Sequence, residues 1–201
     1  MKYTNDFSVE HSLNNGIERV TYMPTHRRSE TPLLMQHGMW HAAWCWRHWQ
    51  ELFAIWGWET HAYSLPGHGG SPVQRPIRWA TLNYYFEFLK AEIARLPHRP
   101  VLIGHSMGGA LTQWYLKYGG GPSTLPAVAG QALPAAVLVA PWTSHNMLPS
   151  IFRSVWRDPL GAILCILTLT STPMARNPAR AAEMFIHSDA LYSPEELHAR
   201  L

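Results

Sequence analysis

Apolar and polar residues first follow an extended pattern along the chain. The segments "FSVEHSL" (7–13) and "IERVTYMPT" (17–25) are typical of strands, and the sequence "NNG" between them is typical of a tight turn. We therefore expect a β-hairpin at the start of the chain. The short apolar run "PLLMQHG" (32–38) follows it and predicts a buried strand.

A helical period of three to four residues replaces this pattern from 41 to 56. Large aromatic side chains recur at that period, so they should form one stripe along a helix. We expect the stripe to pack in the core and not to bind a cofactor. Its members are Trp46, Trp49, Phe53 and Trp56.

Strand and helix patterns then alternate. The segment "THAYSL" (60–65) predicts a strand that ends at the turn-forming sequence "PGHGG". A helix is expected over 79–96, where Pro97 closes it. The run "PVLIGHS" (100–106) predicts the next strand.

A further helix, "MGGALTQWYLKY" (107–118), comes directly after that strand, and glycines 119 to 121 are expected to cap it. The Gly-, Pro- and Ala-rich segment 119–134 predicts a loop. The run "AAVLVAPW" (135–142) is apolar on both faces, as in a parallel strand covered by helices. This alternation predicts an α/β fold with a doubly wound, mostly parallel sheet.

The pattern changes after Trp142, because prolines break the helical segments that follow and no strand is evident. We expect residues 1–142 to form an α/β core and residues 143–201 to form a helical cap. Ser193 and Pro194 predict the start of a last helix. The sequence ends soon after them, so we expect the chain to be a fragment of a longer polypeptide.

The composition is that of a soluble globular protein, with 47% hydrophobic and 14% charged residues in 201. The net charge is +3 and the basic residues are scattered, which argues against nucleic-acid binding. No signal peptide is evident, and no apolar run reaches the roughly 20 residues that span a bilayer, so we expect a cytoplasmic protein without stable membrane insertion. Cys45 and Cys165 are expected to be buried free thiols.

The stretch "VLIGHSMGGAL" carries the clearest chemical signal, because it places Ser106 in the pattern G-x-S-x-G between a strand and a helix. The pattern predicts a sharp, strained turn that exposes the hydroxyl as a nucleophile. Gly104 and Gly108 leave room for neighbouring backbone at such a turn. The start of the helix offers unpaired N–H groups to a developing oxyanion.

A second signal lies at the end of an earlier strand, where His37 and Gly38 begin a loop. The backbone N–H of Met39 can there join that of Met107 in a two-donor oxyanion hole. We expect His37 to shape this loop and not to take part in catalysis.

Three motifs, "HGMWHAAWCW", "LPGHGGS" and "GHSMGG", resemble those of the α/β-hydrolase fold enzymes in order and spacing. Within this family the chain is similar to esterases, lipases and related lyases whose helical cap follows the sixth strand. The resemblance covers residues 33–142 closely and the cap loosely. It implies a serine hydrolase that acts on small esters or other acyl compounds and uses no metal or organic cofactor.

The chain also departs from the family pattern. Many relatives carry an aspartate, usually structural, where this chain has Ser64. The acid and the histidine of the triad normally follow the cap, so we expect them beyond residue 201, and no Ser-His-Asp set can be completed within the chain. We expect Trp40, Trp142 and His145 to line the substrate pocket.

Two alternatives to ester hydrolysis stay open. The motif "HGMWHAAWCW" also occurs in hydroxynitrile-lyase-like enzymes, and the same scaffold carries cofactor-free oxygenases. The chain can also be a binding protein that keeps the pocket without a triad. The apolar residues of the expected cap have two possible roles: they bind an apolar group of the substrate, or they only pack the cap onto the sheet. These residues are Leu148, Ile151, Phe152, Ile163, Leu164, Ile166 and Leu167. The sequence makes no prediction of the oligomeric state.

Overall fold

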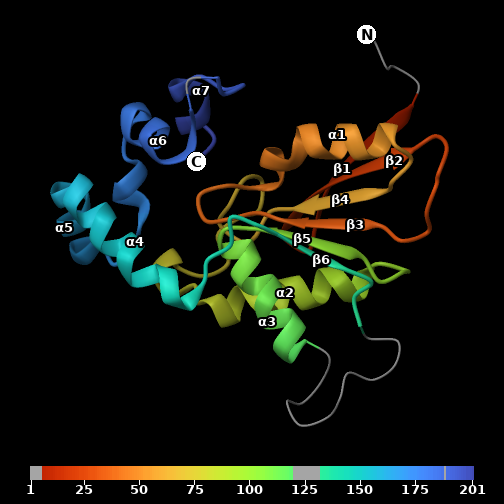
Figure 1. Ribbon diagram of the computed structural model, residues 1–201, viewed down its shortest axis with the longest axis horizontal. Helices are drawn as coiled ribbons and strands as arrows, with labels where there is room; N and C mark the ends of the chain where they lie inside the picture. Colours follow the sequence, from red (N-terminus) through yellow and green to blue (C-terminus); the bar gives the residue numbers. More distant parts are fainter. Residues whose placement is uncertain (1–5, 120–131, 188) are drawn as a thin grey trace. The chain divides into compact units, whose positions relative to one another are not determined.

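The computed structural model of the protein describes residues 6–119, 132–187 and 189–201 (Figure 1). The chain forms two compact units, and the first of them contains the three motifs. The first unit consists of 1–75 and 80–142, and the second of 76–79 and 143–201.

The strands of the described part form one sheet in the first unit, with the order β1-β2-β4-β3-β5-β6. The hairpin β1–β2 is antiparallel, as expected, and β2 is also antiparallel to β4. The other neighbours pair in parallel, which confirms a mostly parallel sheet. The strands are β1 (Phe7–Asn14), β2 (Ile17–Pro24), β3 (Leu33–Gln36), β4 (Thr60–Tyr63), β5 (Val101–His105) and β6 (Ala136–Val139).

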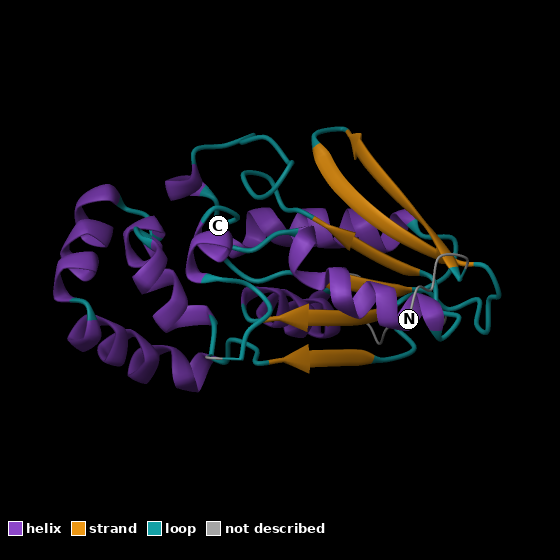
Figure 2. Ribbon diagram, turned by 90° about the horizontal axis from the view of Figure 1, so that it is seen from above, coloured by secondary structure: helices purple, strands orange, loops and turns teal. Residues whose placement is uncertain are grey.

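Helices cover both faces of this sheet (Figures 1 and 2). Helix α1 (Arg47–Ile55) lies on one face, and α2 (Leu82–Arg95) and α3 (Met107–Tyr118) lie on the other. Successive side chains of a strand point to opposite faces, so Leu34 of β3 joins the cluster under α2 and α3 while Met35 joins the one under α1. This arrangement confirms the doubly wound α/β fold.

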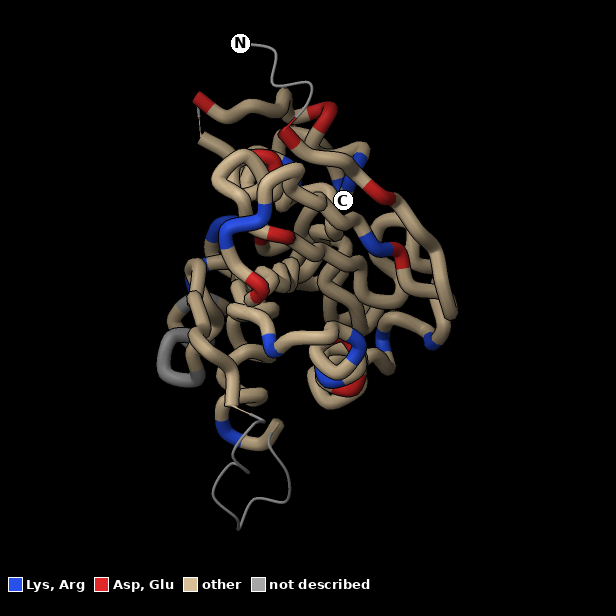
Figure 3. The backbone as a smooth tube through the Cα atoms, turned by 90° about the vertical axis from the view of Figure 1, so that its right-hand side faces the viewer, with Lys and Arg blue, Asp and Glu red and all other residues tan. Residues whose placement is uncertain are grey.

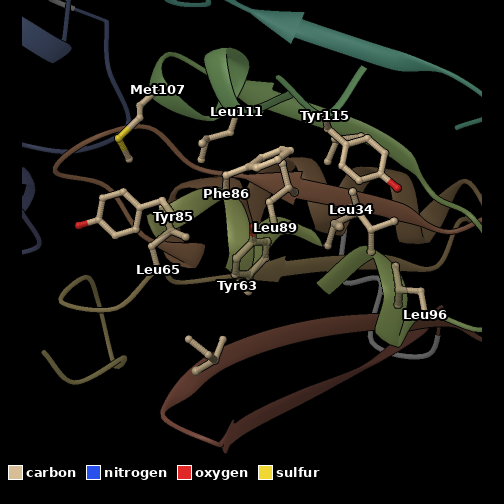
Figure 4. Packing of buried hydrophobic residues seen from close by; sticks show 13 residues of the cluster. Leu34, Tyr63, Leu65, Tyr85, Phe86, Leu89, Leu96, Met107, Leu111 and Tyr115 are labelled. Carbon is tan, nitrogen blue, oxygen red and sulfur yellow. The ribbon is translucent and has the colours of Figure 1, made fainter. Parts of the chain in front are cut away.

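The cluster under α2 and α3 is the larger of the two (Figure 4). In Figure 4, Phe86 and Leu89 of α2 point toward Leu34 and Tyr63 of the sheet. The buried hydroxyl of Tyr63 donates a hydrogen bond to the side chain of Gln36, so its polar atom is satisfied within the core. This packing fixes the strand ends from which the candidate site is built.

Two helices begin later than the sequence predicted. The region 41–56 opens with a short 3₁₀ helix (Ala43–Trp46), and α1 begins only at Arg47. Helix α2 begins after Thr81, whose hydroxyl accepts a hydrogen bond from the N–H of Tyr84 at 3.2 Å. This side-chain cap, and not the apolar period, sets the start of α2.

The predicted burial of the whole aromatic stripe is wrong. Trp46 is buried, but Trp49 and Trp56 are 42% and 49% exposed. The buried line of α1 runs instead through Gln50 and Ala54, because the Gln50 amide donates to backbone and side-chain oxygens of the neighbouring strands. This rotation moves the two tryptophans to the flank of the helix.

The prediction that the last strand is covered on both faces is also wrong. Val137 and Leu138 of β6 are each 41% exposed. Within the described residues β6 is an edge strand paired with β5 alone, so part of its surface lacks neighbours. Gly119, at the end of α3, has an ordinary helical φ of −72° and forms no left-handed cap. The other two predicted capping glycines, and most of the predicted loop, lie outside the described residues.

The second unit consists of helices in its described part. Asp158 caps α5, where it accepts from the N–H of Gly161 at 2.9 Å and pairs with Arg176. The hydrogen bonds from Arg176 lower the pKa of Asp158 to about 2. Ser193 and Glu196 form a capping box, which confirms the predicted start of the last helix. The α-helices are α4 (Ser144–Arg157), α5 (Pro159–Thr168), α6 (Pro178–Phe185) and α7 (Pro194–His198).

Charged residues of both signs are interspersed along the backbone (Figure 3). Cys45 and Cys165 are free thiols, as predicted. Both are half-buried, whereas the sequence predicted buried thiols. Among the residues that the structure describes, no helix combines the length and the apolar character needed to cross a membrane.

Candidate active site

Ser106 occupies a strained turn between β5 and α3. Its φ of 53° and ψ of −114° lie in a region that residues other than glycine rarely adopt. Hydrogen bonds hold this conformation, because the N–H of Ser106 donates to Val139 O and its carbonyl accepts from the N–H of Trp142, each at 3.0 Å. This is the sharp strand-to-helix turn that the pattern G-x-S-x-G predicted.

Glycines around the turn allow backbone segments to approach closely. A Cβ atom on Gly104 would lie 2.5 Å from the carbonyl oxygen of Gly108, and a Cβ on Gly108 would lie 2.3 Å from the carbonyl oxygen of Gln36. Carbon and oxygen atoms do not approach this closely, so neither position can accept a side chain without movement of the backbone. The start of α3 is thereby held against the end of β3.

The loop after β3, residues 38–43, passes directly beside the nucleophile candidate; we call it the oxyanion loop. A Cβ atom on Gly38 would lie only 2.8 Å from Cβ of Ser106. Trp40 has a positive φ of 64°, which bends the loop sharply. Met39, one predicted oxyanion donor, packs against the same core cluster as Met107, the other. Met107 is the first residue of α3, so no preceding helical turn supplies a carbonyl group for the N–H of Met107.

His37 anchors the start of this loop. Its ring is buried. Nδ1 is hydrogen-bonded to the carbonyl oxygen of Gly38 at 2.7 Å, and Nε2 accepts a hydrogen bond from the N–H of Leu65 at 3.0 Å. These two contacts select the neutral tautomer with the proton on Nδ1. Burial, and then the neighbouring His68, hold the pKa of His37 well below its usual value. Both ring nitrogens are therefore engaged in shaping the loop.

Three further histidines lie near the carboxyl ends of these strands. The ring of His68 is 5.1 Å from that of His37, and the ring of His105 is 5.8 Å from that of His41. Burial lowers the pKa of each of these three imidazoles. All four rings are consequently neutral near pH 7.

Among the described residues, no side chain is hydrogen-bonded to Ser106 as a general base would be. Its hydroxyl makes no hydrogen bond to any described residue. A cluster of three or more His, Cys, Asp or Glu side chains suited to a metal ion is also absent from these residues. The arrangement thus brings a hydroxyl to a strained turn beside the start of a helix and the oxyanion loop. The roles of Ser106 as nucleophile and of Met39 and Met107 as oxyanion donors stay predictions.

The predicted pocket residues are divided between the two units. Trp40 and Trp142 are half-buried in the first unit, and the side-chain amide of Gln113 donates to the carbonyl of Trp142 at 3.0 Å. His145 belongs to α4 of the second unit, and its side chain lies outside the described residues. A pocket lined by these three residues stays a prediction.

The apolar residues predicted to belong to a cap lie on α4 and α5 of the second unit. Five of them are exposed, Leu164 is half-buried, and the side chain of Leu148 lies outside the described residues. The exposed ones are Ile151, Phe152, Ile163, Ile166 and Leu167.

One polar group near the oxyanion loop was not predicted from the sequence. The carboxylate of Glu18, on β2, accepts hydrogen bonds from the hydroxyl of Ser64 and from the N–H of Gly70. The only signal for this contact is the antiparallel pairing of β2 with β4, which no local pattern specifies.

Comparison with known protein families gives a match over most of the chain. A family model described as the alpha/beta hydrolase family matches residues 33–200. None of the curated proteins matches the chain.

The solved structures that match with a TM-score above 0.5 share the fold at low sequence identity. A predicted CIB-like hydrolase from Thermoplasma acidophilum is 19% identical with a TM-score of 0.53, and the match covers 69% of this chain and 66% of that one. An epoxide hydrolase from Vigna radiata is 19% identical with a TM-score of 0.53, covering 78% and 49%. An alpha/beta hydrolase from Novosphingobium aromaticivorans is 21% identical with a TM-score of 0.47, covering 67% and 44%.

The chain thus spans between 44% and 66% of the length of these proteins. The family model extends over both units of the chain, from β3 to α7. With the doubly wound sheet and the strained serine turn, it shows that this chain belongs to the alpha/beta hydrolase family.

Proposed function

We propose that the chain is the nucleophile-bearing part of a serine hydrolase that acts on carboxylic esters or related acyl compounds. The observation that supports this most is the conformation of Ser106, strained at φ 53° beside the oxyanion loop. Strain of this kind persists only where the surrounding structure enforces it, and it concentrates at functional sites.

In the proposed reaction the Ser106 hydroxyl attacks the carbonyl carbon of the acyl group. Its proton passes to a histidine base, which we place in the full-length protein outside these residues together with the acid that orients it. The N–H groups of Met39 and Met107 stabilise the negative charge that develops on the carbonyl oxygen. Collapse of this intermediate releases the alcohol and leaves an acyl-serine, which water then hydrolyses with the same histidine as base.

The proposed substrate is a small ester or acyl compound with an apolar group. This assignment draws on the apolar side chains of α4 and α5 in the unit that follows the nucleophile motif. The reaction needs no metal or organic cofactor, since serine and backbone N–H groups supply the nucleophile and the electrophilic stabilisation together.

The test is covalent labelling of the full-length protein with a fluorophosphonate, followed by hydrolysis of p-nitrophenyl acetate and butyrate. Wild-type protein should be labelled and active, and Ser106→Ala should lose both properties. The matched control is Ser8→Ala, an exposed serine of β1, which should keep both. Undiminished labelling of Ser106→Ala would refute the assignment.

These measurements, together with an assay of cyanohydrin cleavage, separate the alternative functions. A labelled protein that cleaves cyanohydrins and leaves esters intact would be a lyase on this scaffold. A folded full-length protein that is neither labelled nor active would be a binding protein.

A further inference from the structure

Ser64 connects two segments that meet beside the oxyanion loop. It follows β4 directly and its side chain is fully buried. The Ser64 hydroxyl accepts a hydrogen bond from the N–H of Ala43, the last residue of the oxyanion loop, at 2.9 Å. The same hydroxyl donates to Oε2 of Glu18 at 2.5 Å.

The Glu18 carboxylate is bound by neutral donors. Its Oε2 atom also accepts from the N–H of Gly70 at 2.9 Å. The backbone N–H of Glu18 donates to the Ser71 hydroxyl at 2.9 Å, and that hydroxyl donates to the Ser64 carbonyl at 2.6 Å. Glu18 takes part in no ion pair among the described residues. Hydrogen bonds to a charged acceptor of this kind are stronger than those between neutral groups.

The turn after β4 is shaped around this carboxylate. A Cβ atom on Gly69 would lie 2.6 Å from Oε2 of Glu18, and one on Gly70 would lie 2.7 Å from its Oε1. Gly69 also has a φ of +51°, and its Cβ would lie 2.7 Å from Cβ of Ala42 in the oxyanion loop. The two glycines therefore admit both the carboxylate and the loop.

The Glu18 carboxylate fixes the direction of the hydrogen bonds that lead from Ala43 through Ser64 to Glu18. Because it carries no proton, the Ser64 hydroxyl must donate to it, and the lone pairs of that hydroxyl are left for the N–H of Ala43. With an amide at position 18, the acceptor of Ser64 and Gly70 loses its negative charge, and an NH₂ group turned toward them cannot accept their hydrogen bonds at all. Ser64 is then held less firmly, and its hydrogen bond from the N–H of Ala43 weakens.

The oxyanion loop is held at both ends by one short segment. At its start, His37 accepts from the N–H of Leu65, and at its end Ala43 donates to Ser64. Met39, the proposed oxyanion donor, lies between these two anchors in the sequence. A shift of either anchor moves its N–H group.

We propose that Glu18 is a positioning residue for the oxyanion hole, acting on the oxyanion loop through Ser64. This inference rests on the proposed function, in which the N–H of Met39 binds the oxyanion. The carboxylate comes from the N-terminal hairpin, 46 residues away from Ser64 in sequence, and reaches the oxyanion loop through the Ser64 hydroxyl.

The test compares Glu18→Gln with Glu10→Gln in the full-length protein, by kinetics and by amide hydrogen exchange. Glu10 is an exposed carboxylate of β1 and serves as the matched control. In Glu18→Gln, kcat should fall about 10- to 100-fold with KM nearly unchanged, because the oxyanion donor acts mainly in the transition state. Exchange at the N–H groups of Ala43 and Gly70 should accelerate at least tenfold, and Glu10→Gln should change neither quantity.

A rescue variant distinguishes positioning from a general loss of stability. The double variant Glu18→Ala with Ser64→Asp places the carboxylate at the residue after β4, directly beside the N–H of Ala43, and it should recover most of the lost kcat. An unchanged kcat in Glu18→Gln, even with a lowered melting temperature, would overturn the proposal.

Failure of the proposed function has a different signature. In that case wild-type protein shows no Ser106-dependent turnover, whatever stands at position 18. The exchange measurement then decides on Glu18 alone: unchanged exchange at Ala43 overturns its role in the loop, and faster exchange supports it.

Discussion

The substitution Gly108→Ala tests the close packing behind the candidate nucleophile with the smallest possible change. The added methyl carbon would lie 2.3 Å from the carbonyl oxygen of Gln36 and 2.7 Å from that of His37. Carbon–oxygen contacts are normally about 3.3 Å or longer, so the shortest overlap is about 1 Å. Both oxygens belong to the backbone at the end of β3, so no side-chain rotation can relieve the overlap.

The expected magnitude follows from two opposing terms. Overpacking of a close-packed site costs about 1–3 kcal/mol, and a backbone overlap places this variant near 3 kcal/mol. Replacing glycine by alanine in a helix favours the folded state by at most about 1 kcal/mol. The free energy of unfolding should therefore fall by about 2 kcal/mol, which corresponds to about 4–8 °C in Tm for a chain of this size.

The assay is urea and thermal unfolding followed by circular dichroism. Ala110→Gly, at a half-buried position of the same helix, is the control for helix propensity and should lose about 1 kcal/mol. In the full-length protein, Gly108→Ala should also lower kcat about 100-fold, because a 1 Å displacement of α3 misplaces the N–H of Met107. A Gly108→Ala protein as stable as wild type would refute the packing argument.

Two further predictions concern the histidines and the base. Burial lowers the folded-state pKa of His37, His41, His68 and His105, whereas in the unfolded chain each has a pKa of about 6.5. Their contribution to the free energy of unfolding is therefore complete above pH 6.5. Below that pH the free energy of unfolding decreases, by up to about 1.4 kcal/mol per pH unit for each ring. Urea unfolding between pH 7.5 and 5.0 should show this decline and His68→Gln should reduce it; a flat profile would contradict the burial. Separately, the 201-residue chain should hydrolyse p-nitrophenyl acetate no faster than its Ser106→Ala variant, since its serine lacks a base among the described residues. Serine-dependent turnover on the order of 10 per second would instead place the base within the chain.

Local patterns predicted the order of elements and the position of the serine turn. The helix of residues 107–118 has the predicted bounds, because Ser106 forces a sharp turn and the helix period starts at once after it. The capping box at Ser193 was predictable for the same reason, since its hydrogen bonds join residues three apart. Interactions of such short range are encoded in neighbouring residues.

Helix rotation and strand exposure were decided by tertiary contacts. The sequence shows an aromatic stripe on α1, but the hydrogen bonds of Gln50 to the sheet turn that helix and leave Trp49 and Trp56 exposed. The apolar run of β6 is typical of a strand covered on both faces. Its actual exposure depends on which strand lies next to it in the sheet.

The sequence by itself determined that Ser106 lies in a strained turn between a strand and a helix, because glycine spacing and periodicity are local properties. Only the tertiary structure decided what surrounds that turn. Gly38 comes within contact of Ser106, and the Glu18 carboxylate reaches the oxyanion loop through Ser64, because strands distant in sequence pair side by side in the sheet. Pairing of this kind depends on the burial of whole faces, and no short stretch of residues specifies it.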